Sequence, residues 1–340
     1  MNFSRRQRFI CCLLLFGVQA TATFHLHAQH YPAGSEGIKA GSLPSSGFYV
    51  MDYNSFYIYD KVPGFGGQAQ KGFTQFDYTQ TPRLMWITDW KLLGANFGMA
   101  ARIPFAYQQY THNVPNYPPP PLPPPFPTPS SYTKTTDSHF GLSDIQIEPI
   151  ILSWHLKHFD ISSSYSFWAP TGDFPGGNFN KNSTLFYTLG QGYWTHSFSL
   201  GVTWYPDTGK TWAISLLNHY DINTAQYSGL YNGTGGTIVS RDTTLGNIYT
   251  LEWAVSKTIV KGVDVGLTGY YQQQVTSTEG PTSNGPTWQG ERIHVAGIGP
   301  EIRANYAKWG LSASLRYDYE FSAMDHPQGN LINFTVTKSF

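Results

Sequence analysis

The feature that most restricts the fold of this chain is a strict alternation of apolar and polar residues over long runs. Between Leu311 and Phe321 every second residue is Leu, Ala, Tyr or Phe, and the residues between them are Ser, Arg, Asp or Glu. Residues 95–110 and 262–275 follow the same pattern. A period of two predicts β-strands with one apolar and one polar face. Strands in soluble proteins average five or six residues, so runs of ten or more favour strands that cross a membrane obliquely.

Turn signals divide the chain into about twelve such strands. Tight connections alternate with long polar or Gly/Pro-rich segments, as periplasmic turns alternate with external loops in outer-membrane barrels. The final run, which ends at Phe340, is expected to pair with the first, so that no backbone edge meets lipid. We therefore predict an all-β, transmembrane antiparallel β-barrel of about 12 strands; a large secreted β-sandwich is the alternative. The predicted strands are 48–59, 75–90, 95–110, 139–154, 159–169, 186–205, 210–222, 247–257, 262–275, 291–306, 311–323 and 330–340.

The first residues have the build of a secretory signal peptide. Three arginines precede an apolar stretch and small residues, which is too short to span a membrane. Cleavage after Ala22 or after Ala28 fits the pattern equally well. Both cysteines, Cys11 and Cys12, lie in this segment, so the mature chain would have no thiols. We expect a signal peptide (1–28), a short periplasmic segment (29–46) and a barrel (47–340), with both termini periplasmic.

The charge composition excludes some classes of function. Charged residues make up only 12% of the chain, and 21 basic residues are balanced by 21 acidic ones. This balance leaves no basic surface for nucleic acid. Outer-membrane lipid is the expected surrounding, and the terminal Phe340 resembles the signature that the barrel-assembly machinery recognises.

Prolines mark two further features. A run of prolines between Pro115 and Pro129 predicts a stiff polyproline arm on an external loop, 111–138, which serves either as a spacer or as a ligand. Pro104 and Pro149 interrupt two neighbouring predicted strands, where each removes a ladder donor. They mark either a lateral seam in the wall or ordinary bulges that adjust its curvature.

No catalytic, metal or cofactor motif is evident, and we expect no enzyme and no cofactor. The pair His155 and His158 has metal-like spacing but lies in a tight turn without a third ligand. In a barrel the polar face is the lumen, where charges either meet the solute or stabilise the wall as pairs. The candidate lumen-lining residues are Arg102, Asp144, Glu148, Glu252, Asp264, Glu301, Arg303, Arg316, Asp318 and Glu320.

Several motifs resemble a known outer-membrane family. They include "WITDWKLLGANFG", "GLSDIQIEPIILSW", "FWAPTGDF", "GYYQQQVT" and "VAGIGPEIRANY". They are similar to the proteins of the MetA-pathway (meta-pathway) of phenol degradation, distant relatives of outer-membrane transporters for fatty acids and aromatic hydrocarbons. The resemblance implies a barrel in the bacterial outer membrane that admits small hydrophobic solutes, aromatic ones in particular, by passive uptake, through the lumen or sideways through the wall. The alternative function is a structural or adhesive surface barrel that acts through its external loops.

Overall fold

The computed structural model describes residues 29–61, 74–116, 131–173, 189–225, 232–233, 236–237, 244–279, 293–324 and 326–340. The expected signal peptide and most of the proline run lie outside these residues. The strands are β1 (Gly47–Lys61), β2 (Thr74–Leu92), β3 (Ala95–Arg102), β4 (Phe105–Asn116), β5 (Ser131–Leu142), β6 (Ile145–His155), β7 (Phe159–Ala169), β8 (Thr195–Trp204), β9 (Trp212–Asn223), β10 (Asn232–Gly233), β11 (Gly236–Thr237), β12 (Ile248–Val260), β13 (Val263–Gln274), β14 (His294–Tyr306), β15 (Leu311–Met324) and β16 (Gln328–Ser339), with a short 3₁₀ helix, η1 (Ala307–Trp309).

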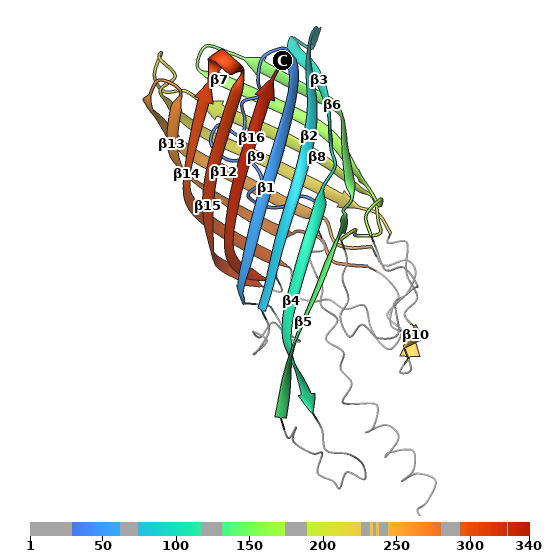
Figure 1. Ribbon diagram of the computed structural model, residues 1–340. Helices are drawn as coiled ribbons and strands as arrows, with labels where there is room; N and C mark the ends of the chain where they lie inside the picture. The colour runs from blue at the N-terminus through green and yellow to red at the C-terminus, as the bar shows by residue number, and fades with distance from the viewer. Residues whose placement is uncertain are drawn as a thin grey trace, which may run out of the picture.

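Fourteen of these strands form one antiparallel sheet that closes on itself (Figure 1). The last strand, β16, pairs with β1, and β1 pairs in turn with β2. Phe340 adds a closing bond, because its N–H donates to the carbonyl of Phe48 at 3.0 Å. β3 and β4 form one interrupted wall strand, as do β5 and β6, so the described sheet is a barrel of twelve wall strands. The predicted fold class is therefore confirmed.

The alternation in the sequence separates the two faces of the wall. Tyr53 points inward and reaches the barrel interior, whereas Leu315 is 51% exposed on the outside. A shift by one residue would exchange the two faces of a strand, so this pattern fixes the register. Among the described residues no helix is both long and apolar enough to span a membrane.

The predicted external loop 111–138 is partly strand. β4 continues to Asn116 and β5 starts at Ser131, and the two pair along their whole length. β2 supports β4 only as far as Thr111. Beyond that point the hairpin leaves the barrel as a narrow arm, at the end opposite the C-terminus (Figure 1). The predicted polyproline segment lies mostly in 117–130, outside the described residues.

Short turns lie at the end of the barrel that carries the C-terminus. Leu93 and Gly94 connect β2 to β3, and both have positive φ angles, 53° and 80°. This geometry belongs to a two-residue hairpin turn, whose twist matches that of the flanking strands. Lys338 lies on the apolar side of the last strand, but its Nζ donates to the carbonyl of Trp309 in η1 at 2.6 Å. The ammonium thus reaches the end of the barrel, and its aliphatic stem remains on the outer face.

Residues 29–46, which were expected as a periplasmic segment, run through the interior of the barrel; we call them the N-terminal plug. Gly34 contacts β16 through Asn333, Ile38 contacts β14, and His30 contacts β8. A segment that touches strands on opposite sides of a closed sheet must lie inside it.

The assignment of faces predicts the reactivity of single cysteines in the mature chain, which is expected to have no other thiol. In lipid vesicles Ser314→Cys should react with small aqueous maleimides, and the adjacent Leu315→Cys should react only with lipid-soluble ones. The reverse pattern, measured by mass spectrometry, would contradict the register of β15.

Candidate functional site: the plugged lumen and the interrupted wall

The plug is held by carboxylates of the wall that accept its backbone N–H groups. Glu252 of β12 accepts the N–H of Ser35 at 3.1 Å and that of Glu36 at 2.9 Å. Glu301 of β14 accepts the N–H of Ile38 at 2.8 Å. The plug has no strand or helix of its own, so buried N–H groups need such partners. The acidic residues of the wall therefore serve as acceptors for an irregular backbone.

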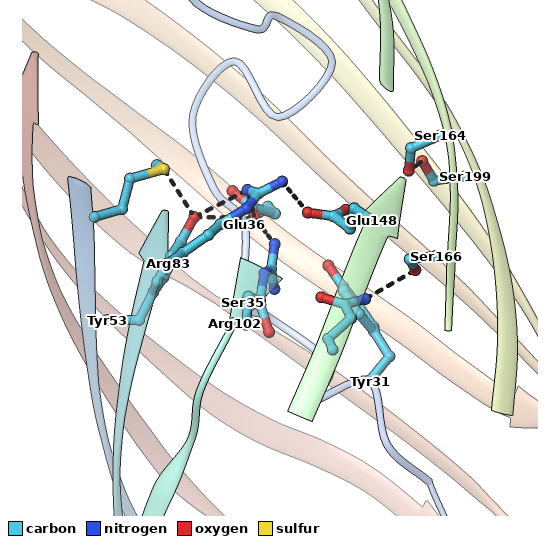
Figure 2. Close-up of polar contacts among 12 residues, drawn as sticks. Tyr31, Ser35, Glu36, Tyr53, Arg83, Arg102, Glu148, Ser164, Ser166 and Ser199 are labelled. Carbon is cyan, nitrogen blue, oxygen red and sulfur yellow. Dashed lines mark hydrogen bonds and ion pairs between the residues drawn. The ribbon is translucent and has the colours of Figure 1, made fainter. Parts of the chain in front are cut away.

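Glu36 of the plug is at the centre of an ion cluster in the middle of the barrel (Figure 2). Its Oε1 lies 2.9 Å from Nη2 of Arg102 and 3.6 Å from Nη1 of Arg83. Arg83 Nη2 lies 2.5 Å from Oε2 of Glu148. Arg83 was not among the expected lumen residues, because its neighbour Pro82 obscured the alternation of β2.

The cluster stabilises the ionised form of Glu36. Burial raises the pKa of this carboxyl, but Arg102, Arg83 and Arg303 outweigh that effect and hold the pKa below its usual value. Arg316 of β15 also donates to the backbone carbonyl of Glu36. Charged groups from four strands therefore converge on one residue of the plug.

Two glycines allow the plug to approach the wall closely. A Cβ on Gly41 would lie 2.5 Å from backbone atoms of Val202 in β8, so a side chain has no space there. Gly34 has a φ angle of +73°, which residues with a side chain rarely adopt. The path of the plug therefore depends on glycine at both positions.

A cavity of about 430 Å³ lies between the plug and the wall, toward the short-turn end. One side is apolar and includes Leu43, Met85 and Ile151, which belong to or pack on a buried cluster. The other side carries hydroxyl groups from β15 and β16, including Ser312 and Thr335. The interior thus combines an apolar face with a polar one.

The structure brings six of the ten candidate lumen residues into contact with the plug. Asp264 of β13, for example, accepts the Lys39 ammonium at 2.8 Å. Arg303 lies 3.7 Å from Glu301, and Asp318 lies 2.9 Å from Arg316. The six that meet the plug are Arg102, Asp144, Glu252, Asp264, Glu301 and Arg316; the four that meet only other wall residues are Glu148, Arg303, Asp318 and Glu320.

Two neighbouring wall strands are interrupted at the same height. Arg102, the last residue of β3, is opposite Gln146, and Phe105, the first residue of β4, is opposite Leu142. Residues 103–104 and 143–144 lie between these pairs outside any strand. We call this region the wall break. One backbone hydrogen bond crosses it, from the N–H of Ser143 to the carbonyl of Pro104 at 2.8 Å.

Asp144 joins the wall break to the plug. Its carboxylate accepts the N–H of Gly172 at 2.8 Å and the N–H of Gln191 at 2.6 Å. Oδ2 also lies 2.7 Å from Nε2 of His30 in the plug. The motifs "GLSD" and "APTGD", which carried the family resemblance, therefore meet at this break. A Cβ on Gly172 would lie 2.7 Å from the backbone of Ser143, so the two motifs are in close contact.

The prolines lie at different heights of the wall. Pro104 is within the wall break, whereas Pro149 lies in β6 beside a register shift between Ile147 and Ile150. Pro82 of β2, which the sequence analysis did not single out, is next to the break: its carbonyl accepts the N–H of Ile103 at 3.0 Å. The described residues contain no group of three or more His, Cys, Asp or Glu side chains that could hold a metal ion.

Gly41→Val should displace the plug, because the added side chain would overlap the backbone of Val202. We expect faster amide hydrogen exchange across residues 30–45 and a higher ion conductance in planar bilayers. Gly209→Val is the matched control, since a Cβ there meets only side-chain atoms, of Asp207 at 3.3 Å and of Thr211 at 3.5 Å. Equal exchange in both variants would contradict the close contact.

Docking of the plug should weaken in mild acid through His30. Burial lowers the pKa of His30 below its usual 6.5, and the bond to Asp144 offsets this only in part. The undocked imidazole takes up a proton more readily, so docking loses stability as the pH falls below about 6.5. Amide exchange of residues 29–35, corrected for its intrinsic pH dependence, should therefore rise between pH 7.5 and 5.5. His30→Gln should remove that rise; an unchanged pH dependence would contradict the assignment to His30.

The comparisons with known proteins concern the fold and the family of the chain. The crystal structure of the COG4313 outer membrane channel from Pseudomonas putida F1 superposes with a TM-score of 0.65 at 12% identity, covering 92% of this chain and 100% of that one. A FadL homologue from Pseudomonas aeruginosa gives 0.41 at 12% identity, covering 89% and 92%. No curated protein matches the chain. The model of the family described as "Putative MetA-pathway of phenol degradation" matches residues 60–336, and the chain belongs to this family.

Proposed function

We propose that the protein is a channel of the bacterial outer membrane for passive uptake of small hydrophobic, preferably aromatic, compounds. The short-turn end and the C-terminus would face the periplasm, and the β4–β5 arm would face the exterior. Gln29, where the described plug begins, lies instead at the arm end of the barrel, beside His326 of the β15–β16 connection. Phe340 would present the end of β16 to the assembly machinery. The family and the barrel fold support a transport role in this membrane.

The observation that carries the proposal is the wall break beside a plugged lumen. Ion pairs and carboxylate acceptors hold the plug across the barrel, which opposes flow of polar solutes through the centre. At the break, by contrast, side chains and a connecting segment replace the ladder that would otherwise seal the wall. Such irregular backbone at membrane depth is tolerated where protein groups satisfy it. A hydrophobic solute would leave sideways into the bilayer through this opening.

The charged residues around the lumen would then position the plug and the break. Glu252, Glu301 and Asp264 hold the plug, whereas Asp144 holds both the plug and the segments that cover the break. The apolar side of the cavity, with Met85 and Ile151, gives an apolar solute a surface inside the barrel.

A reversible staple across the wall break tests the lateral route. A backbone hydrogen bond joins Pro104 and Ser143, so cysteines at these two positions lie next to each other across the break, and mass spectrometry of the oxidised protein checks that they form a disulfide. The oxidised protein should lose uptake of phenols and alkanes into liposomes, and reduction should restore it. Ser163 and Leu200, which are register partners on the continuous wall, provide the control pair. Full hydrophobic uptake in the oxidised Pro104→Cys/Ser143→Cys protein would exclude the lateral route.

An adhesive surface barrel remains the second candidate, because the β4–β5 arm extends past the support of β2. Deleting 115–129 separates the two functions. It should abolish adhesion but leave liposome uptake of the same solutes nearly intact. Loss of uptake in this deletion would assign transport to the arm instead.

A further inference from the structure

The outer face of β1 carries a polar group where the surrounding wall is apolar. Tyr53 points inward, since its hydroxyl donates to Glu36 at 3.3 Å, so Asp52 and Asn54 on either side of it point outward. On β2, Gln80 is opposite Asn54, and the pairing of the two strands runs without a register shift. Asp52, Asn54 and Gln80 therefore share one patch of the outer surface.

The carboxylate of Asp52 has only weak partners. Asn54 Nδ2 lies 3.1 Å from its Oδ2, and Gln80 Nε2 lies 3.3 Å and 3.2 Å from its two oxygens. No basic side chain in the described part of the chain forms an ion pair with it. A carboxylate offers about four acceptor positions, and a charged donor approaches to about 2.7–2.9 Å. The Asp52 carboxylate can therefore accept a shorter and stronger hydrogen bond than those from the amides of Asn54 and Gln80.

The patch lies near the middle of the apolar band. Along β1 the outward residues run from Phe48 to Ile58, and at a tilt of about 40° this stretch spans roughly 25 Å, the height of such a band. Asp52 is about 10 Å above Phe48 on the same estimate. The exposed apolar side chains around the patch are Phe48, Phe56, Leu84, Trp86, Phe105 and Phe334.

An acidic side chain that faces lipid at this depth is costly, and where it occurs it usually marks a functional site. The curvature and closure of the sheet do not require an acidic side chain at this position, because the neighbouring outward positions of β1 are Val50 and Phe56. A donor that arrives from the membrane would stabilise the carboxylate, and this donor must be attached to an apolar body.

The patch is also beside the wall break. Asp52 is opposite Pro82, whose carbonyl accepts the N–H of Ile103, and Gln80 is opposite Phe105. Two strand spacings, about 10 Å, separate the strand of Asp52 from the break. β1, β2 and β4 lie side by side on the near wall in Figure 1.

We propose that Asp52, Asn54 and Gln80 form a membrane-facing binding site for the polar end of an amphipathic molecule, an amine or hydroxyl donor on an apolar body, next to the lateral opening. The inference rests on the proposed function for the direction of transfer, because a solute that leaves through the break would meet this site first. The polar end donates to Asp52, and the apolar body lies along Leu84 and Phe334.

A small ligand fits the patch better than a second copy of the chain. These three polar side chains and the Tyr78 hydroxyl, which donates to Asn54 Oδ1 at 2.7 Å, form a small group within an apolar surface. Stable protein interfaces, by contrast, bury about 800 Å² on each partner and combine polar and apolar contacts over that area. Pairing of two copies through this patch is therefore an outcome that would overturn the proposal.

Photolabelling in lipid nanodiscs tests the site. The probes are three diazirine-bearing C16 chains that end in a primary amine, in a hydroxyl or in a methyl group. Peptides from β1 and β2 are scored by mass spectrometry in the wild-type protein and in Asp52→Asn, Gln80→Leu and Asp60→Asn. Asp60 lies on the same strand and the same face beyond the apolar band, so Asp60→Asn is the matched control.

In the wild type the amine or the hydroxyl probe should label β1 and β2 more than the methyl probe. Asp52→Asn should lower that labelling by about tenfold, Gln80→Leu should lower it less, and Asp60→Asn should leave it unchanged. A loss with the amine alone assigns an ammonium ligand, and a loss with both assigns any N–H or O–H donor. Equal labelling by all three probes, no effect of Asp52→Asn, or protein–protein crosslinks that depend on Asp52 would overturn the site.

Uptake by wild-type proteoliposomes, measured on the same preparations, keeps the two proposals apart. Absence of all hydrophobic uptake would refute the channel function, whereas the labelling result decides the site alone. Each folded variant should migrate faster on a denaturing gel when it is loaded unheated than when it is boiled first.

Discussion

Every backbone N–H and C=O group in a wall that crosses a bilayer needs a partner, and this constraint explains how the barrel is built. Ladder bonds satisfy it around most of the sheet, and closure of β16 on β1 removes the edges. At the wall break the ladder stops, and Asp144 and the bond between Ser143 and Pro104 take its place. A region that depends on a few side chains is easier to open than one held by a continuous ladder.

The same constraint applies inside the barrel, where the plug has no regular structure. Wall carboxylates accept its N–H groups, and Glu36 places its own charge among Arg83 and Arg102. Removing one member of such a buried group would leave the others without partners, which is why these residues act as a unit. His30 links this unit to the break through Asp144.

Most of the wall could be predicted from the alternation, but two regions could not. The strand expected at 186–205 begins only at Thr195, because the N–H of Gln191 donates to Asp144 instead of to a ladder. The strand expected at 139–154 starts at Ser131 and is interrupted after Leu142. Periodicity reports which face a residue occupies, and it contains no information about side chains that replace ladder bonds.

The sequence by itself determined the fold class, the approximate strands and the face of each residue, since a period of two has only one consistent register against lipid. Only the tertiary structure decided what those residues contact. Glu36 and Glu252 are 216 positions apart and meet because the sheet closes around the plug. The interior placement of residues 29–46, the pairing of Arg83 with Glu148 and the contact of Asp52 with Gln80 all depend on which strands lie side by side, which no local pattern records.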